Sequence, residues 1–223
     1  MKNRLLSIAI ILVLSASLAV AQDQTKMSFG ILGGVNFQNL NGKLSSGDDL
    51  ENDMLMGFHG GINIQMPIAP EFYFQPGLMY ATKGAKYTEG SLTSTTKLNY
   101  IEMPLNMVYK ASLGNGFFML GFGPYLGYAI GGNVKTEGGS ISLEQDIEFK
   151  SVVETGDPLT VPYYKAFDAG ANIFIGYQMA GGLFLQLDTQ FGMLNINPED
   201  KRILTDKSSK KNTGFGLSLG YRF

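Results

Sequence analysis

The sequence predicts an all-β fold, an eight-stranded antiparallel, up-and-down β-barrel that spans a membrane. Three observations support this fold class. Apolar residues alternate with small or polar ones along most of the chain, helical periodicity is almost absent, and the connections between the alternating segments are short and long in turn. The segments are longer than the ~5–6 residues of an average strand and suit the ~9–11 residues that a membrane strand needs.

The start of the chain predicts export from the cytoplasm. Lys2 and Arg4 supply a basic beginning, an uncharged run follows, and residues 19–21 form an A-x-A cleavage site. We therefore expect residues 1–21 to be a cleaved signal peptide and residues 22–223 to form one barrel domain. An N-terminal membrane helix is the alternative, but the apolar run is short for a ~20-residue span and small residues follow it.

The predicted strands lie roughly at 28–38, 55–66, 71–84, 97–110, 116–130, 165–178, 182–194 and 212–223. The short connections between them are 67–70, 111–115 and 180–182. The long polar connections are about 39–54, 85–96, 131–164 and 195–211. In outer-membrane barrels short turns face the periplasm and long loops face outside, so an even number of strands places both ends of the barrel in the periplasm.

The two faces of the strands differ in the way that lipid-facing and lumen-facing surfaces differ. In the sixth segment Phe167 and Ile173 lie on one face, and Asp168 and Asn172 on the other. The polar face is rich in Gly, Asn and Gln rather than Lys and Glu, which suits a narrow lumen that side chains fill. A soluble barrel would need a charged exterior that this chain does not supply.

Aromatic residues mark both ends of the apolar face, as expected where rings meet lipid headgroups. One predicted girdle, near the short turns, contains Phe29, Phe72, Tyr109, Phe118, Tyr177, Tyr221 and Phe223. The other, near the long loops, contains Phe37, Phe58, Tyr80, Tyr128, Phe167, Phe191 and Phe215.

Three prolines, Pro76, Pro104 and Pro124, lie inside predicted strands, although a closed barrel has no free edge to host them. We expect bulges or missing ladder hydrogen bonds there. The last segment, 212–223, has to close onto the first, 28–38.

Composition excludes several functions. Charged residues make up 16% of the chain and the net charge is −2, so the basic face of a nucleic-acid binder is not expected. The chain has no cysteine, which excludes a disulfide framework, a zinc ribbon and a thiol nucleophile. The glycine-rich stretch 121–132 is not G-x-G-x-x-G and opens no helix, so nucleotide binding is not expected and no cofactor is predicted.

Four stretches together resemble the PorT-like outer-membrane β-barrel family. They are "YIEMPLNMVYK" (100–110), "GFGPYLGYAIGG" (121–132), "FDAGANIFIGYQ" (167–178) and the terminal "LSLGYRF". The resemblance implies an eight-stranded barrel in the outer-membrane lipid, inserted by the barrel-assembly machinery. That machinery recognises a final strand with a terminal aromatic residue, and Tyr221 and Phe223 match this assembly signal. Most members of the family have no established activity.

Seven polar side chains project into the lumen by strand parity: His59, Lys83, Glu102, Lys110, Asp168, Asp188 and Arg222. They allow two interpretations, an ion path or a plug of ion pairs and hydrogen bonds. The plug is favoured, because eight strands leave an interior that side chains fill and charges in a closed interior must be paired.

A hydrolase at the outer rim would depend on His59, the single histidine, with Asp168 as a partner across the lumen. Catalysis would also require a positioned nucleophile, and no motif supports one. The sequence therefore does not predict an enzyme.

Two long connections carry further candidates. Asp48, Asp49, Glu51 and Asp53 lie close together in the first and offer oxygen ligands for Ca²⁺, but they lack EF-hand spacing, so a solvated loop is the simpler interpretation. In the third, residues 140–152 alternate as a strand does, which predicts a hairpin extending the fifth and sixth strands above the membrane. The apolar side of this hairpin needs cover, from residues 159–164 or from a partner.

We therefore expect a non-enzymatic outer-membrane barrel with a plugged lumen, whose long extracellular loops contact a protein or small-ligand partner. A narrow pore for small solutes or ions is the alternative.

Overall fold

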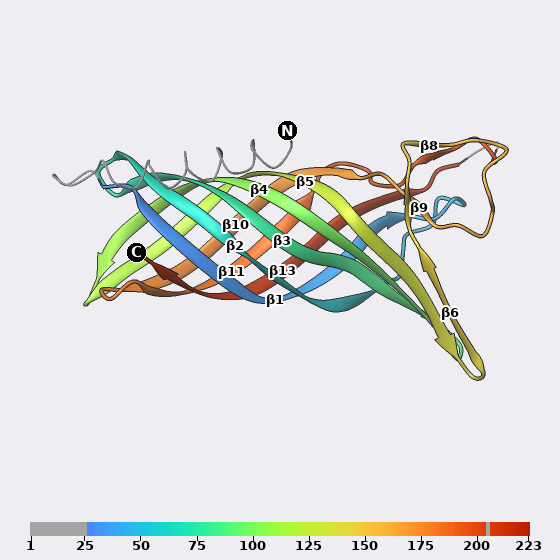
Figure 1. Ribbon diagram of the computed structural model, residues 1–223, viewed down its shortest axis with the longest axis horizontal. Coiled ribbons are helices and arrows are strands. Elements are labelled where there is room, and N and C mark those ends of the chain that lie inside the picture. The colour runs from blue at the N-terminus through green and yellow to red at the C-terminus, as the bar shows by residue number, and fades with distance from the viewer. Residues whose placement is uncertain (1–25, 204–205) are drawn as a thin grey trace, which may run out of the picture.

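The structure, a computed structural model, describes residues 26–203 and 206–223. Eight antiparallel strands close into a ring in the order β1–β2–β3–β4–β5–β10–β11–β13 and back to β1, which confirms the predicted fold class (Figure 1). The strands are β1 (Ser28–Lys43), β2 (Asp53–Ala69), β3 (Phe72–Glu89), β4 (Leu92–Leu113), β5 (Gly116–Gly138), β10 (Phe167–Met179), β11 (Leu183–Gly192) and β13 (Ser209–Arg222). The predicted signal peptide, residues 1–21, lies outside the described residues.

Five shorter strands lie outside the ring: β6 (Ile141–Asp146), β7 (Glu148–Phe149), β8 (Val152–Val153), β9 (Tyr163–Tyr164) and β12 (Glu199–Asp200). All five are at one end of the barrel, which we call the loop end. The turn end, opposite, carries the short connections after β2, β4 and β10, together with the C-terminus (Figure 1). In the described part of the chain no helix is long and apolar enough to cross a membrane.

The last strand closes the ring onto the first, as predicted. Pairing between β1 and β13 runs from Gly30 with Arg222 to Lys43 with Ser209. Beyond it, the backbone N–H of Phe223 donates to the carbonyl of Phe29 at 2.8 Å.

The predictions for two of the long loops are wrong in part. Residues 85–96 form the ends of β3 and β4, joined by a tight turn at Gly90 (φ 60°), and residues 131–138 continue β5. The polar run at 93–96 is rich in threonine, a β-branched residue that suits strands, and it pairs with β3 on one side and β5 on the other. The three strands therefore extend beyond the membrane, where β6 pairs with the end of β5. We call this extension the projecting sheet.

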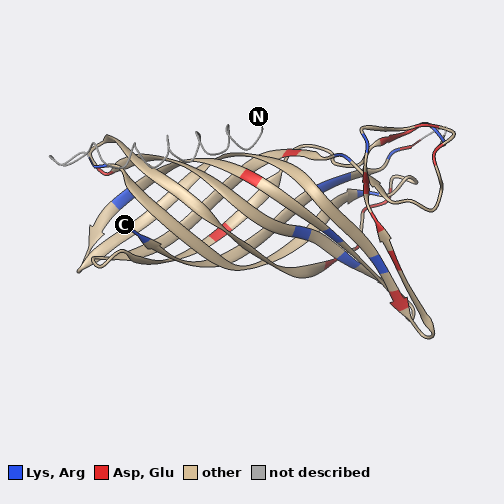
Figure 2. Cartoon of the chain, in the orientation of Figure 1, with Lys and Arg blue, Asp and Glu red and all other residues tan. Residues whose placement is uncertain are grey.

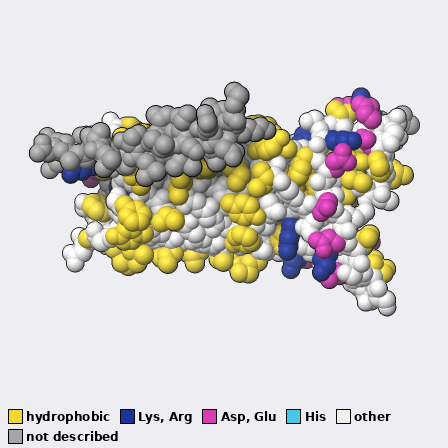
Figure 3. All heavy atoms as spheres, in the orientation of Figure 1, with side chains coloured by type: hydrophobic (Ala, Val, Ile, Leu, Met, Phe, Trp, Pro, Cys, Tyr) yellow, Lys and Arg dark blue, Asp and Glu magenta, His cyan; other side chains and the backbone are white. Residues whose placement is uncertain are grey.

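The predicted alternation of outward-facing apolar and inward-facing polar side chains is confirmed along the strands of the barrel. Ile173, Leu187 and Leu219 are about half exposed, whereas Asp168 is fully buried on the opposite face. Figure 3 shows patches of hydrophobic side chains on the part of the barrel wall in view, and most charged residues lie at the loop end (Figures 2 and 3). This distribution matches a lipid-facing wall.

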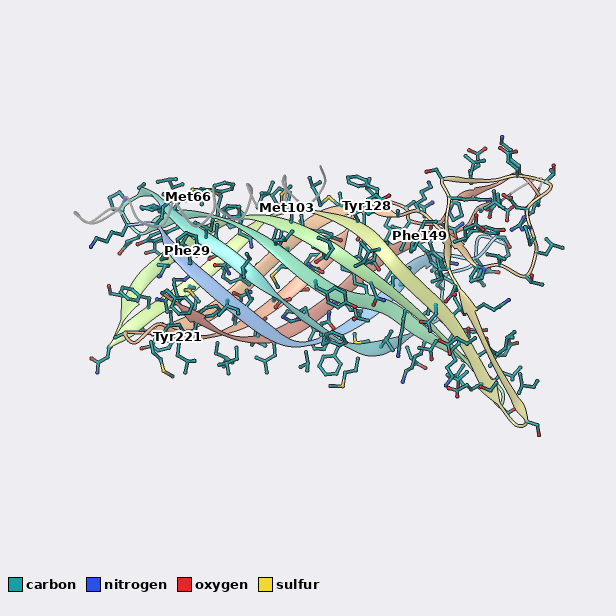
Figure 4. All side chains as sticks on the ribbon, viewed as in Figure 1. Phe29, Met66, Met103, Tyr128, Phe149 and Tyr221 are labelled. Carbon is teal, nitrogen blue, oxygen red and sulfur yellow. The ribbon has the colours of Figure 1, made fainter. Side chains whose placement is uncertain are left out.

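Both aromatic girdles are present, and cross-strand ring pairs join neighbouring staves within each. At the loop end Phe37 stacks on Phe215, with ring centroids 5.2 Å apart. At the turn end Phe72 packs against Tyr109 at 5.1 Å. Figure 4 shows Phe29 and Tyr221 near the turn end and Tyr128 nearer the loop end.

The strand prolines coincide with missing ladder contacts, as expected. Pairing of β3 with β4 is interrupted just beyond Pro76, and pairing of β4 with β5 just beyond Pro104, without a change of register across either gap. Each proline lacks the N–H that a ladder hydrogen bond needs. Pro124 is accommodated next to Ala171 of β10.

Candidate functional site

A buried ion-pair cluster crosses the lumen near the loop end. The Lys83 ammonium of β3 lies 2.5 Å from Glu102 Oε1 of β4 and 3.4 Å from Asp168 Oδ2 of β10. Their side chains are 0%, 4% and 0% exposed. The structure thus brings together three of the seven residues predicted to face inward, and we call them the Lys83 cluster.

Three further residues surround this cluster, and the sequence analysis did not assign them to it. The Tyr125 hydroxyl and the Asn212 amide donate to Asp168 Oδ2 at 3.0 and 2.9 Å. The Lys83 ammonium lies 4.3 Å from the Tyr125 ring centroid and 5.3 Å from that of Tyr100. These rings give the buried cation additional electrostatic stabilisation.

The family-like motifs meet at this cluster. Tyr100 and Glu102 belong to "YIEMPLNMVYK", Tyr125 to the Gly-Pro-Tyr segment, and Asp168 to "FDAGANIFIGYQ". Tyr100 and Tyr125 lie in the same set of motifs as Glu102 and Asp168. This was the sequence signal that could have assigned both tyrosines to the site.

His59 lies deeper in the lumen, away from its proposed partner. Its Nε2 is 2.6 Å from Ser218 Oγ, and that hydroxyl donates to Asp188 Oδ1 at 3.4 Å. Asp168, considered as a partner, instead accepts from Tyr125 and Asn212. The adjoining cavity has a volume of about 70 Å³, which is room for a few waters at ~30 Å³ each. Ser218 is 0% exposed, so the His59–Ser218 contact lies inside the lumen and not at the outer rim, where the hydrolase was considered.

Two cations lie in the lumen near the turn end, and we call them the basic mouth. The Lys110 ammonium donates to Gln178 Oε1 at 3.0 Å and to Gln65 Oε1 at 3.3 Å. Arg222 Nη2 donates to Asn63 at 2.9 Å and to Gln75 at 3.1 Å. Among the described residues neither cation has a carboxylate within 4.0 Å, so the expected ion pairing is replaced here by side-chain amides.

An apolar cluster, which we call the inner apolar cluster, lies between the cavity and the basic mouth on the side of β1, β4, β5, β10 and β11. On the side of β2 and β3, Asn63 and Gln75 line the cavity and also accept from Arg222. Leu32, Val108, Met119, Phe174 and Phe184 form the inner apolar cluster. Its rings need the space that glycine leaves, since a Cβ at Gly121 would lie 2.1 Å from Phe174 and one at Gly220 2.2 Å from Phe184. Gly121 and Gly220 are the direct register partners of Phe174 and Phe184, so each ring lies over a neighbouring strand at a position that has no side chain.

A second apolar cluster, the apolar cap, closes the loop end. Ile147, Tyr164 and Ile196 come from the outer connections and pack on residues of the barrel rim, namely Leu40, Ala85, Leu98, Tyr100 and Ala129. β7 pairs with β9 in parallel, which joins Phe149 to Tyr164. The predicted packing of 140–152 against 159–164 is therefore confirmed for this part of the segment.

The rest of that segment differs from the prediction. β6 pairs with the extension of β5 rather than joining a hairpin of the fifth and sixth barrel strands, because the turn at Gly139 (φ 57°) folds the chain back on β5 at once. Ile141 and Leu143 remain 56% and 52% exposed.

Ion pairs lie within the connection between β11 and β13 and within the connection before β10, and a hydrogen bond from Arg202 joins the two connections. Arg202 makes a two-point contact with Asp200 through Nε at 2.9 Å and Nη2 at 2.6 Å, and Nη1 donates to the Pro158 carbonyl at 2.9 Å. Lys150 donates to Asp157 at 2.8 Å. The guanidinium of Arg202 holds the pKa of Asp200 below its ordinary value, and Lys150 does the same for the pKa of Asp157.

The acidic residues of the first connection do not converge on a metal site. Asp48 accepts from Ser46 at 2.7 Å, Asp49 lies 3.5 Å from Lys43, and Asp53 begins β2. Among residues 26–203 and 206–223 no group of three or more His, Cys, Asp or Glu side chains is placed to hold a metal ion.

Comparison with known families identifies the barrel. Residues 20–197 match the family described as "Outer membrane protein beta-barrel domain". The chain belongs to this family. It is accordingly an outer-membrane protein, with its lipid-facing wall in that bilayer, its turn end toward the periplasm and its loop end outside. No curated protein matches the chain.

Solved structures of several outer-membrane barrels are similar at low identity. Ail of Yersinia pestis is 11% identical with a TM-score of 0.42, over 89% of this chain and 99% of that one. Neisserial surface protein A is 16% identical with a TM-score of 0.40, over 87% and 95%. AlkL is 14% identical with a TM-score of 0.34, over 92% and 94%. These values are too low to carry a statement about function.

Proposed function

We propose that this protein is a sealed, non-enzymatic barrel that anchors a binding platform on the outer face of the membrane. The observation that carries the proposal is the layered closure of the lumen. From the loop end inward lie the apolar cap, the Lys83 cluster, a cavity of about 70 Å³, the inner apolar cluster beside Asn63 and Gln75, and the basic mouth. Such an interior supports an anchor rather than a conduit.

The platform consists of the projecting sheet and the connections packed beside it. Strand pairing places Tyr87 of β3 and Leu92 of β4 on the same face as Ile141 and Leu143 of β6. These side chains are between 40% and 56% exposed although they lie beyond the lipid-facing wall. β6 also presents an edge that pairs with no other described strand. Exposed apolar side chains and a free strand edge are features of interaction sites.

Conductance tests this proposal directly. Purified full-length protein in planar bilayers is expected to show no steady conductance, because the apolar cap closes the loop end and side chains fill the lumen below it. Current that persists and scales with the number of inserted barrels would replace the anchor with the narrow pore.

Cross-linking at the platform tests the binding role. The chain has no cysteine, so Leu143→Cys creates one defined attachment point on the apolar face of β6. On intact cells Leu143→Cys is expected to yield a discrete cross-linked adduct. The matched controls are Glu144→Cys, on the opposite face of β6, and Leu187→Cys, in the barrel wall. Equal adducts from all three, or none from Leu143→Cys, would count against the platform.

We further propose that the chain is a PorT-like member of its family and is assembled by the barrel-assembly machinery. The convergence of Tyr100, Glu102, Tyr125 and Asp168 on one cluster supports a structural role for the residues of these motifs. Tyr221 and Phe223 support the assembly signal: their rings form an edge-on pair 4.9 Å apart, and Phe223 is 76% exposed.

Deletion of Phe223 is expected to lower the amount of folded protein in the outer membrane several-fold. The deletion removes the terminal aromatic and its hydrogen bond to Phe29, but no side chain of the lumen. The measurement is the heat-modifiable fraction in isolated outer membranes, with Phe223→Tyr as a control that keeps the aromatic ring. Normal levels of the truncated protein would contradict the assembly role.

The signal peptide belongs to the same proposal. We expect the mature protein to begin at Gln22, and intact-mass measurement of protein purified from membranes checks this. A mass that includes residues 1–21 would indicate retention.

A further inference from the structure

A groove opens at the loop end between the first long connection and the projecting sheet. Its volume is about 440 Å³, within the ~300–1,000 Å³ range of small-molecule sites. The connection from Leu44 to Asn52 forms one wall, and side chains of β3 and β4 form the other. The lining residues are Leu40, Leu44, Asp48, Asp49, Leu50, Glu51, Asn52, Ala85, Tyr87, Ser94, Thr96, Tyr164 and Lys210.

The bottom of the groove is apolar and belongs to the rigid part of the molecule. Leu40, Ala85 and Tyr164 are 3%, 4% and 4% exposed and are members of the apolar cap. Tyr87 is 44% exposed and stands on the same face of β3 as Ala85. Leu44, in the opposite wall, is 48% exposed, so Tyr87 and Leu44 supply the apolar surface that a ligand body can cover above this buried floor.

The rim of the groove is acidic. Asp48, Asp49 and Glu51 all lie on the wall formed by the first connection, and Lys210 is the one basic residue of the lining. The Lys210 ammonium faces Tyr164, 3.4 Å from its hydroxyl and 4.7 Å from its ring centroid. Asp49 has Lys43 at 3.5 Å, but both side chains are more than half exposed, so water largely screens that pair. Three carboxylates against one ammonium leave the lining with an excess of negative charge.

We propose that this groove binds an organic cation with an apolar body, such as an arylalkyl ammonium or guanidinium compound. The apolar body lies between Leu44 and Tyr87, and the cationic group lies among the carboxylates of the rim. Tyr87 adds an aromatic face that attracts a cation. The proposal rests on the proposed function, because the groove is part of the binding platform and would be its small-molecule site.

Three matched probes test the chemistry: 4-phenylbutylamine, 4-phenylbutanol and 4-phenylbutyrate. The full-length protein in phosphatidylcholine nanodiscs is titrated by calorimetry, with empty nanodiscs subtracted to remove partition into lipid. The amine is expected to bind about tenfold more tightly than the alcohol, and the butyrate to give no measurable heat. Equal binding of amine and alcohol, or tighter binding of the butyrate, would overturn the proposal.

Variants locate the site. Asp49→Asn with Glu51→Gln is expected to weaken the amine about tenfold and leave the alcohol unchanged, since it removes two rim charges. Tyr87→Ala is expected to weaken both probes. Glu137→Gln with Glu144→Gln, which removes two charges from β5 and β6 outside the groove, is the matched control. A loss of amine affinity in the control as large as in the rim variant would assign the effect to general charge and overturn the site.

The two proposals fail separately. If the protein shows neither amine binding nor conductance, the proposal for the groove is overturned and the sealed anchor stands. Steady conductance overturns the sealed anchor whatever the groove binds, because the groove lies outside the apolar cap.

Discussion

Replacement of Lys83 with methionine is expected to destabilise the barrel by about 3–5 kcal/mol, the usual cost of breaking a buried ion pair. The substitution leaves Glu102 and Asp168 together in the lumen without their cation, and their side chains are 4% and 0% exposed. The measurement is the free energy of unfolding in a guanidinium titration of vesicle-inserted protein, followed by circular dichroism.

A triple variant is the matched control for this prediction. Lys83→Met combined with Glu102→Gln and Asp168→Asn removes all three charges at nearly constant volume. It is expected to return to within about 1 kcal/mol of the wild type, since neutral replacement of a buried ion pair is often tolerated. If the single and triple variants lose equal stability, the loss comes from packing around Tyr100 and Tyr125 and not from uncompensated charge.

Leu217→Arg is expected to cost about 2–4 kcal/mol of folding stability, the range measured for a lipid-facing cation at the bilayer midplane. Leu217 lies between the two aromatic girdles, 41% exposed, and pairs with Val35 and Leu187 in an apolar row. The same unfolding titration measures the effect.

Phe191→Arg provides the depth control, because Phe191 is 49% exposed in the girdle at the loop end. Near the interface a cation costs only about 0–1 kcal/mol. Similar losses at positions 191 and 217 would mean that the girdles do not mark the edges of the lipid layer.

The fold was largely predictable because a period of two fixes which face of a strand meets lipid. The pattern around Ile173 and Asp168 was sufficient to assign both surfaces of β10. It could not set the length of β3, β4 and β5, since a threonine-rich stretch such as 93–96 looks like a polar loop until the neighbouring strands that pair with it are known. The extension above the membrane depends on the pairing of all three strands with one another.

Strand parity also predicted which residues face the lumen, but it could not predict which of their side chains are in contact. Lys83 and Asp168 come together only because tilted strands bring them to the same depth, and that depth depends on register around the whole ring. Lys110 and Arg222 lie where no described carboxylate reaches them, so amides take the place of the expected counter-charges. The outer groove was not predictable, because the fold of the first connection depends on its contacts with β3 and β4.

The pairing of Gly30 with Arg222 also constrains when this barrel can form. β1 finds its second neighbour only when β13 has arrived, so the ring cannot close before that strand is in place. Until then two strand edges are unpaired, which is a hazard for association with other chains. Any chain that ends before β13 keeps both edges open, so the presence of β13 is itself the condition for a closed barrel.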